Sequence, residues 1–102
     1  MYLIEKSNIF DKWLLKLKDY RAKAKILTQI KRMELGNLGD HKSLGSGIYE
    51  IRIDYGPGYR LYYSKIEASI ILLLVGGDKS SQLSDIQKAK QMLKELEGKN
   101  GD

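Results

Sequence analysis

The spacing of apolar residues predicts helices in the first third of the chain. After Ser7 and again after Asp19, apolar residues recur every three or four positions, which is the period of a helix with one buried face. Ser7 and Asp19 are residue types that cap helix N-termini, and Gly36 is expected to end the second helix. Because the connection between the two segments is short, we expect an antiparallel helical hairpin.

Farther along the chain the period changes to two, which predicts strands. Residues 49–54 alternate between apolar and charged side chains, so Tyr49, Ile51 and Ile53 are expected to face a core. The sequence Gly56-Pro57-Gly58 predicts a turn, after which residues 59–63 return as a second strand. Residues 69–75 are apolar without alternation, as expected for a central strand covered on both faces.

The remaining segments complete an α+β domain. Residues 2–5 form a short strand candidate, and residues 37–47 are expected to be a loop with a short extended piece around Leu44. An amphipathic helix is expected from a cap at Ser80 or Ser81 to about Gly98, on or beside the charged face of the sheet. The predicted order is β-α-α-β-β-β-α, with residues 1–98 as one domain and residues 99–102 as a frayed tail.

Charge is concentrated on the predicted hairpin. Nine Lys/Arg and two Asp lie between Lys6 and Arg32, a local net charge of +7 in a chain whose formal net charge is +5. Such asymmetry favours a polyanionic partner such as nucleic acid, or an acidic protein. For any single lysine, a solvated helix face is the simpler interpretation.

Several classes of function are disfavoured by composition. The chain has no Cys and one His, His41, so a thiol nucleophile is excluded and a metal site or other cofactor is not expected. The longest apolar run, residues 70–75, is far shorter than the roughly 20 residues of a membrane span. The N-terminal segment has no long apolar core, so we expect a cytoplasmic protein without membrane association.

Three stretches of sequence resemble a known group of proteins. The hairpin segment FDKWLLKL, the stretch GIYEIRIDYGPGYRLYY and the stretch IILLLVGGDKS occur in the order and spacing of the RelE/ParE toxin superfamily. Within it they are similar to the HigB-like branch, the addiction module killer proteins. The resemblance implies a helical hairpin on one face of a curved, mostly antiparallel sheet, with function on the concave opposite face.

The resemblance also implies a function. RelE-like members cut messenger RNA in the ribosomal A site without metal, ParE-like members inhibit DNA gyrase, and a co-expressed antitoxin silences both. We therefore expect a toxin of a type II toxin–antitoxin system whose partners are an antitoxin, the ribosome and mRNA, forming a hetero-oligomer with the antitoxin. Gyrase inhibition and non-catalytic RNA binding remain the alternatives.

The predicted catalytic cations lie on the charged face of the strand hairpin. Metal-free cleavage uses the ribose 2′-hydroxyl as nucleophile, so the protein must stabilise negative charge on the phosphate. The family's cationic positions fall on Arg52, Arg60 and Lys79, and these side chains are expected to converge. Pairing of Arg60 with Glu50 or Asp54 is the structural alternative. Tyr62 is expected to point outward beside Arg60 and to stack on a base.

Proton transfer is predicted less directly. Glu50 stands where some RelE relatives have a lysine that suits a general base, and Asp85 stands near the place of a tyrosine of the terminal helix. Glu50 would act as a base if burial raised its pKa, and Tyr62 or His41 could contribute. A salt-bridge role for Glu50 is equally good, and His41 is expected to be an exposed loop residue.

Further RNA contacts are expected outside the catalytic group. The RNA-binding candidates are Lys23, Lys25, Lys31, Arg32 and Tyr59. Because the four cations lie on the predicted hairpin, we expect them away from the catalytic cleft, where they would serve ribosome or antitoxin contact.

Overall fold

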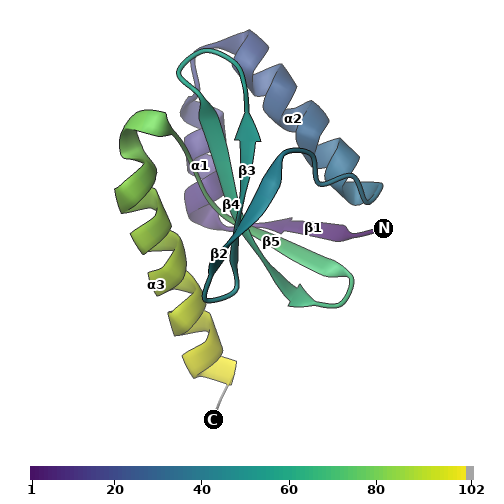
Figure 1. Ribbon diagram of the computed structural model, residues 1–102, viewed down its shortest axis with the longest axis vertical. Helices are drawn as coiled ribbons and strands as arrows, with labels where there is room; N and C mark the ends of the chain where they lie inside the picture. Colours follow the sequence, from purple (N-terminus) through teal and green to yellow (C-terminus); the bar gives the residue numbers. More distant parts are fainter. Residues whose placement is uncertain (101–102) are drawn as a thin grey trace.

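The protein folds as a five-stranded mixed sheet with helices on both faces, so the predicted α+β class is confirmed (Figure 1). The computed structural model describes residues 1–100, and side chains through residue 98. The strands are β1 (Leu3–Lys6), β2 (His41–Gly45), β3 (Ile48–Ile53), β4 (Tyr59–Glu67) and β5 (Ile70–Asp78). The helices are α1 (Asn8–Lys16), α2 (Tyr20–Glu34), the 3-10 turn η1 (Lys79–Ser81) and α3 (Gln82–Asn100).

The sheet order is β1-β5-β4-β3-β2, in which β1 runs parallel to β5 and every other neighbouring pair is antiparallel. Strand β2 corrects the prediction of a loop with a short extended piece, because residues 41–45 pair with β3. The intervening turn uses positive φ angles at Gly45, Ser46 and Gly47. Strand β2 lies at the edge of the sheet and most of its residues are exposed. Its sequence therefore lacks the alternation of apolar and charged residues that predicted β3.

Both predicted caps of the helical hairpin are confirmed. The Ser7 hydroxyl accepts a hydrogen bond from the Phe10 amide at 3.0 Å and donates one to the Leu74 carbonyl at 2.6 Å, which ties α1 to β5. The Asp19 carboxylate accepts from the amides of Arg21 and Ala22 at 3.0 and 3.2 Å. Gly36 follows α2 with φ 93°, the left-handed conformation that ends a helix.

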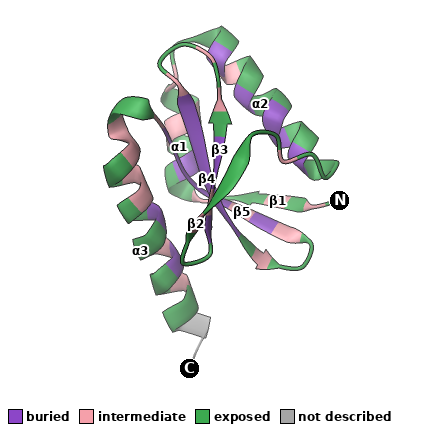
Figure 2. Cartoon of the chain, in the orientation of Figure 1, coloured by how far each residue is buried: buried purple, intermediate pink, exposed green. Residues whose placement is uncertain are grey.

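Two apolar clusters cover the two faces of the sheet. Figure 2 shows that buried residues follow β4 and recur along α2 and α3. Helices α1 and α2 cover one face, where Phe10, Ile26 and Met33 pack with strand residues such as Ile51 and Leu61. Helix α3 covers part of the other face, with these buried members: Ile48, Tyr62, Leu74, Val75, Ala89 and Leu93. The predicted position of the last helix over the charged face is therefore confirmed.

The start of the last helical segment differs from the prediction. The carboxylate that caps the turn before α3 is Asp78, which accepts from the Ser80 amide at 2.8 Å, whereas Ser80 or Ser81 was expected to cap. The helix α3 is described through Asn100, and residues 101–102 of the predicted frayed tail lie outside the described residues. Among residues 1–100, no helix is both long and apolar enough to cross a membrane.

Two adjacent glycines of β5 receive large side chains from opposite faces. A β-carbon at Gly76 would overlap the indole of Trp13, and one at Gly77 would overlap the carboxylate of Asp85. The glycines thus let α1 and the start of α3 approach the sheet closely.

Candidate functional site

A cavity of about 350 Å³ at the end of the β3–β4 hairpin brings the three predicted cations together. Arg52 comes from β3, Arg60 from the facing position of β4, and Lys79 from η1. We call this cavity the cationic pocket, and its remaining lining residues are Asp40, Ile53, Asp54, Gly58 and Tyr59.

Glu50 neutralises part of this charge from beneath. Arg52 and Arg60 lie directly opposite each other on neighbouring strands, an arrangement that repels without a counter-ion. The fully buried Glu50 supplies one, since its Oε1 lies 3.3 Å from Arg60 Nη1 and 3.8 Å from Arg52 Nε. The Arg52 guanidinium also lies 3.9 Å from the exposed carboxylate of Asp40. The structural alternative for Arg60, a pair with Glu50, is therefore present and buried.

Both oxygens of the Glu50 carboxylate have partners, and two of these partners were not predicted. Lys42 Nζ lies 3.9 Å from Oε1, and the Gln82 side-chain amide donates to Oε2 at 3.1 Å. Lys42 was missed because β2 was taken for a loop, and nothing in the sequence singled out Gln82. With these contacts Glu50 is a buried counter-ion, and it does not line the pocket as a base would.

The three cations differ in accessibility. Arg60 is only 8% exposed, and its Nε has no hydrogen-bond partner among the described residues. Arg52 keeps 46% of its side chain exposed, and Lys79 is exposed at the first position of η1. A phosphate entering the pocket therefore meets Arg52 and Lys79 first, with Arg60 behind them.

The prediction that Tyr62 points outward to stack on a base is wrong, because α3 covers this part of the sheet. Tyr62 is fully buried in the cluster beneath α3, and its hydroxyl has no hydrogen-bond partner among the described residues. Burial, and then the negative charges of Glu50 and Asp85, raise the pKa of Tyr62 well above its ordinary value. A neutral, enclosed phenol does not stack on RNA.

Tyr59 lines the cationic pocket, but its ring is not available as a platform. It is 8% exposed and packs edge-on against Trp13, with ring centroids 6.2 Å apart. Burial raises the pKa of its hydroxyl, with smaller contributions from Asp19 and Asp78. The expectation of an RNA contact through the Tyr59 ring is therefore not supported by its position.

The other predicted proton-transfer residues lie outside the pocket lining. Asp85 accepts a hydrogen bond from the Ser81 hydroxyl at 2.5 Å beside Gly77. Burial raises the pKa of Asp85, the Ser81 hydrogen bond opposes this, and Asp78 adds to it. His41 is exposed, as expected, but it begins strand β2 and does not lie in a loop, and its Nδ1 lies 3.0 Å from the Gly39 carbonyl oxygen. The carboxylates that do line the pocket, Asp40 and Asp54, were not predicted as catalytic.

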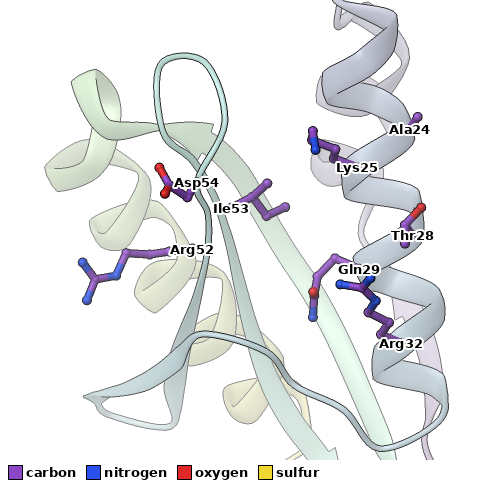
Figure 3. A pocket seen from close by; sticks show the side chains of 8 residues that line it. All are labelled: Ala24, Lys25, Thr28, Gln29, Arg32, Arg52, Ile53 and Asp54. Atoms are coloured by element: carbon purple, nitrogen blue, oxygen red, sulfur yellow. The ribbon is translucent and has the colours of Figure 1, made fainter.

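None of the four basic hairpin candidates lines the cationic pocket, but two of them, Lys25 and Arg32, line a hollow that adjoins it. Figure 3 shows Lys25 and Arg32 of α2 across a hollow from the end of β3, where Arg52 projects away from α2. This second hollow, the helix-side pocket, has a volume of about 430 Å³ and shares three lining residues with the cationic pocket: Arg52, Ile53 and Asp54. Its other lining residues are Ala24, Lys25, Thr28, Gln29 and Arg32.

The remaining basic candidates lie elsewhere. Lys31 lines neither pocket, and Lys23 donates to the Leu15 carbonyl oxygen at 3.3 Å near the turn between α1 and α2. Within the described part of the chain, no group of three or more His, Cys, Asp or Glu side chains gathers in a way that could hold a metal ion.

Comparison with known proteins gives two matches. Residues 12–94 match the family described as "Phage derived protein Gp49-like (DUF891)". A Haemophilus influenzae (strain Rd) protein named "Uncharacterized protein" is 54% identical over 87 residues, which span 85% of this chain and 88% of that protein. The matched segment contains every lining residue of both pockets.

Proposed function

The chain belongs to the phage-derived Gp49-like family, and we propose that it is the toxin of a type II toxin–antitoxin system. The proposal places it among HigB-like members of the RelE/ParE superfamily, as a metal-independent, ribosome-associated mRNA endonuclease in the cytoplasm. Its support is the resemblance of the hairpin, GYR and GGDK segments, together with a matching α+β fold.

The single observation that carries the proposal is the convergence of Arg52, Arg60 and Lys79 on one pocket from three separate elements. Attack of a ribose 2′-hydroxyl on the adjacent phosphorus gathers negative charge on the phosphate oxygens. Guanidinium and ammonium groups fixed around that position stabilise the charge as it develops. The Glu50 carboxylate holds Arg60 in place for this purpose.

The pocket also contains a group to accept the proton. Asp54 lines it and has no ion pair among the described residues, whereas Asp40 is engaged by Arg52. In the proposed step Asp54 takes the 2′-hydroxyl proton, the 2′-oxygen bonds to phosphorus, and the bond to the 5′-oxygen breaks. The leaving 5′-oxygen takes a proton from Lys79 or water, which yields a 2′,3′-cyclic phosphate and a 5′-hydroxyl.

Brief expression in growing bacteria tests the proposal. New 5′ ends of messenger RNA in phase with codons are expected for the wild type and lost in Lys79→Ala. Lys79 is chosen because it is exposed and takes part in none of the ion pairs of the described residues, so its removal leaves folding intact. Lys90→Ala, which removes an exposed lysine from α3, is the matched control. Intact transcripts with blocked DNA supercoiling would favour gyrase inhibition instead.

A non-catalytic RNA-binding toxin is the second candidate, and the burial of Glu50 and Tyr62 favours it. Both were predicted for roles near the reacting phosphate, and neither lines the cationic pocket. Asp54→Asn separates the two functions, because it retains the cations. Loss of cleavage with retained RNA binding supports the nuclease, whereas unchanged growth inhibition without any RNA cleavage supports binding alone.

The proposal includes an antitoxin that binds this protein and masks it. The basic α2 and the cationic pocket favour a partner segment rich in acidic residues. A small gene next to the coding sequence is expected to encode it, and co-expression is expected to restore growth. Harmless high-level expression of this chain alone would contradict the toxin assignment.

A further inference from the structure

The helix-side pocket is joined to the cationic pocket around the end of β3. The two share Arg52, Ile53 and Asp54, so their walls are continuous. In Figure 3 Ile53 points toward α2 and Arg52 points away from it. The end of β3 therefore lies between the helix-side pocket and the cationic pocket. The last backbone hydrogen bond between β3 and the β2 segment runs from the Arg52 amide to the Asp40 carbonyl oxygen at 2.9 Å, so the edge of β3 is open beyond Arg52.

The lining of the helix-side pocket is suited to an anion. Lys25 and Arg32 contribute two positive charges from α2, and Arg52 and Asp54 contribute to its wall at the end of β3. The Lys25 ammonium lies 5.2 Å from the centre of the Tyr55 ring, which restricts its position at the wall.

Gln29 gives independent support for a ligand. Its side chain lines the pocket although the residue is only 9% exposed, and its Nε2 has no hydrogen-bond partner among the described residues. A buried amide donor without a partner is costly, and an acceptor-only ligand in the pocket would satisfy it. The Thr28 side chain lies one residue away on the same wall.

We propose that the helix-side pocket binds a second backbone phosphate of the RNA strand whose reacting phosphate occupies the cationic pocket. This inference rests on the proposed function. The strand crosses the end of β3, with Arg52 between the two phosphates and Lys25, Gln29 and Arg32 around the second. The substrate is therefore a single strand that extends beyond the cut, because a duplex would not bend around one strand end.

Binding of RNA that cannot be cut provides the test. Fully 2′-O-methylated single-stranded oligonucleotides lack the nucleophile, and their binding is measured by fluorescence anisotropy at low salt. The double variant Lys25→Ala/Arg32→Ala is compared with Lys12→Ala/Lys16→Ala, which removes the same charge from exposed positions of α1 outside both pockets.

For a hexanucleotide, affinity is expected to fall about tenfold in the pocket variant and less than twofold in the control, with a shallower salt dependence in the pocket variant. A dinucleotide, which has one internal phosphate, is expected to bind both variants as it binds the wild type. The side-chain amide resonances of Gln29 are expected to shift with the hexanucleotide and not with the dinucleotide.

Three results would overturn the inference. These are equal losses in the two double variants, no loss in the pocket variant, and no binding of the hexanucleotide by the wild type. Tight binding of an acidic octapeptide, with no RNA binding, would assign the pocket to a protein partner instead. If the pocket variant alone loses RNA affinity but the wild type cuts no mRNA, the pocket stands and the nuclease proposal fails.

Discussion

Glu50 is the residue on which the arrangement of charges depends. Its carboxylate lies beneath the cationic pocket, where it contacts Arg52, Arg60 and Lys42 and accepts from Gln82. Because the carboxylate is fully buried, its contact with the nearly buried Arg60 is little screened by water.

Glu50→Gln is expected to lower the free energy of unfolding by about 3 kcal/mol, because Arg60 would remain buried without a counter-ion. Asp40→Asn breaks an exposed contact with Arg52 and is expected to cost less than about 1 kcal/mol. Denaturant unfolding measures both. Equal effects of the two substitutions would show that the buried pair does not hold the site together.

The alternation of residues 49–54 and the turn that follows them predicted that Arg52 and Arg60 share a face, and the register confirms it. Alternation assigns a side chain to a face but does not reveal what covers that face. Tyr62 was therefore expected at the surface, although α3 encloses it. Lys42 and Gln82 depend on contacts between distant segments, which no local pattern marks.

Tyr63 gives a prediction about alkaline stability. Burial raises the pKa of Tyr63 to about 12, from the ordinary value of 10.0. Unfolded chains therefore ionise this phenol first, so its contribution to stability is full below pH 10 and is lost as the pH rises toward 12. Tyr63→Phe is expected to retain more stability than the wild type in this window.

At neutral pH, Tyr63→Phe is expected to raise the free energy of unfolding by about 1 kcal/mol, because the buried hydroxyl has no partner among the described residues. Tyr20→Phe is the control, since Tyr20 is 81% exposed. Urea unfolding at pH 7 and pH 11 distinguishes the two. If the Tyr63→Phe and Tyr20→Phe proteins lost equal stability between pH 7 and pH 11, the claim that Tyr63 causes the alkaline loss of stability would be contradicted.

At the scale of elements, β5 joins the two layers of helices. Trp13 of α1 packs against Gly76, and Asp85 of α3 packs against Gly77, on opposite faces. The helices and the central strands were predictable because each has a regular apolar period. Strand β2 was not, because an exposed edge strand needs no apolar face.

Gly76→Ala is expected to lower the free energy of unfolding by about 2 kcal/mol, because the added methyl group overlaps the Trp13 indole. Gly98→Ala is expected to raise it by about 0.5 kcal/mol, because Gly98 lies in α3 with open space around it and alanine favours the helix. Thermal or denaturant unfolding measures the change in the free energy of unfolding for both variants. A neutral Gly76→Ala would contradict the close packing of α1 on β5.

At the scale of the whole molecule, the fold places charge from distant segments along one edge. The basic bias of the first third of the chain was visible in the sequence, and so was the pair of strand arginines. Their proximity was not, because it depends on α2 crossing the sheet beside the end of β3. The two adjoining pockets are therefore a property of the fold as a whole.

The most direct test of the proposed activity uses purified ribosomes translating a defined mRNA, with wild-type protein, Lys79→Ala and Lys90→Ala. The measurement is the chemistry of the new RNA ends. We predict cuts that leave a 2′,3′-cyclic phosphate and a 5′-hydroxyl with the wild type and Lys90→Ala, at least about tenfold reduced in Lys79→Ala. Intact mRNA with the wild-type protein, or equal cutting by Lys79→Ala, would contradict the central claim.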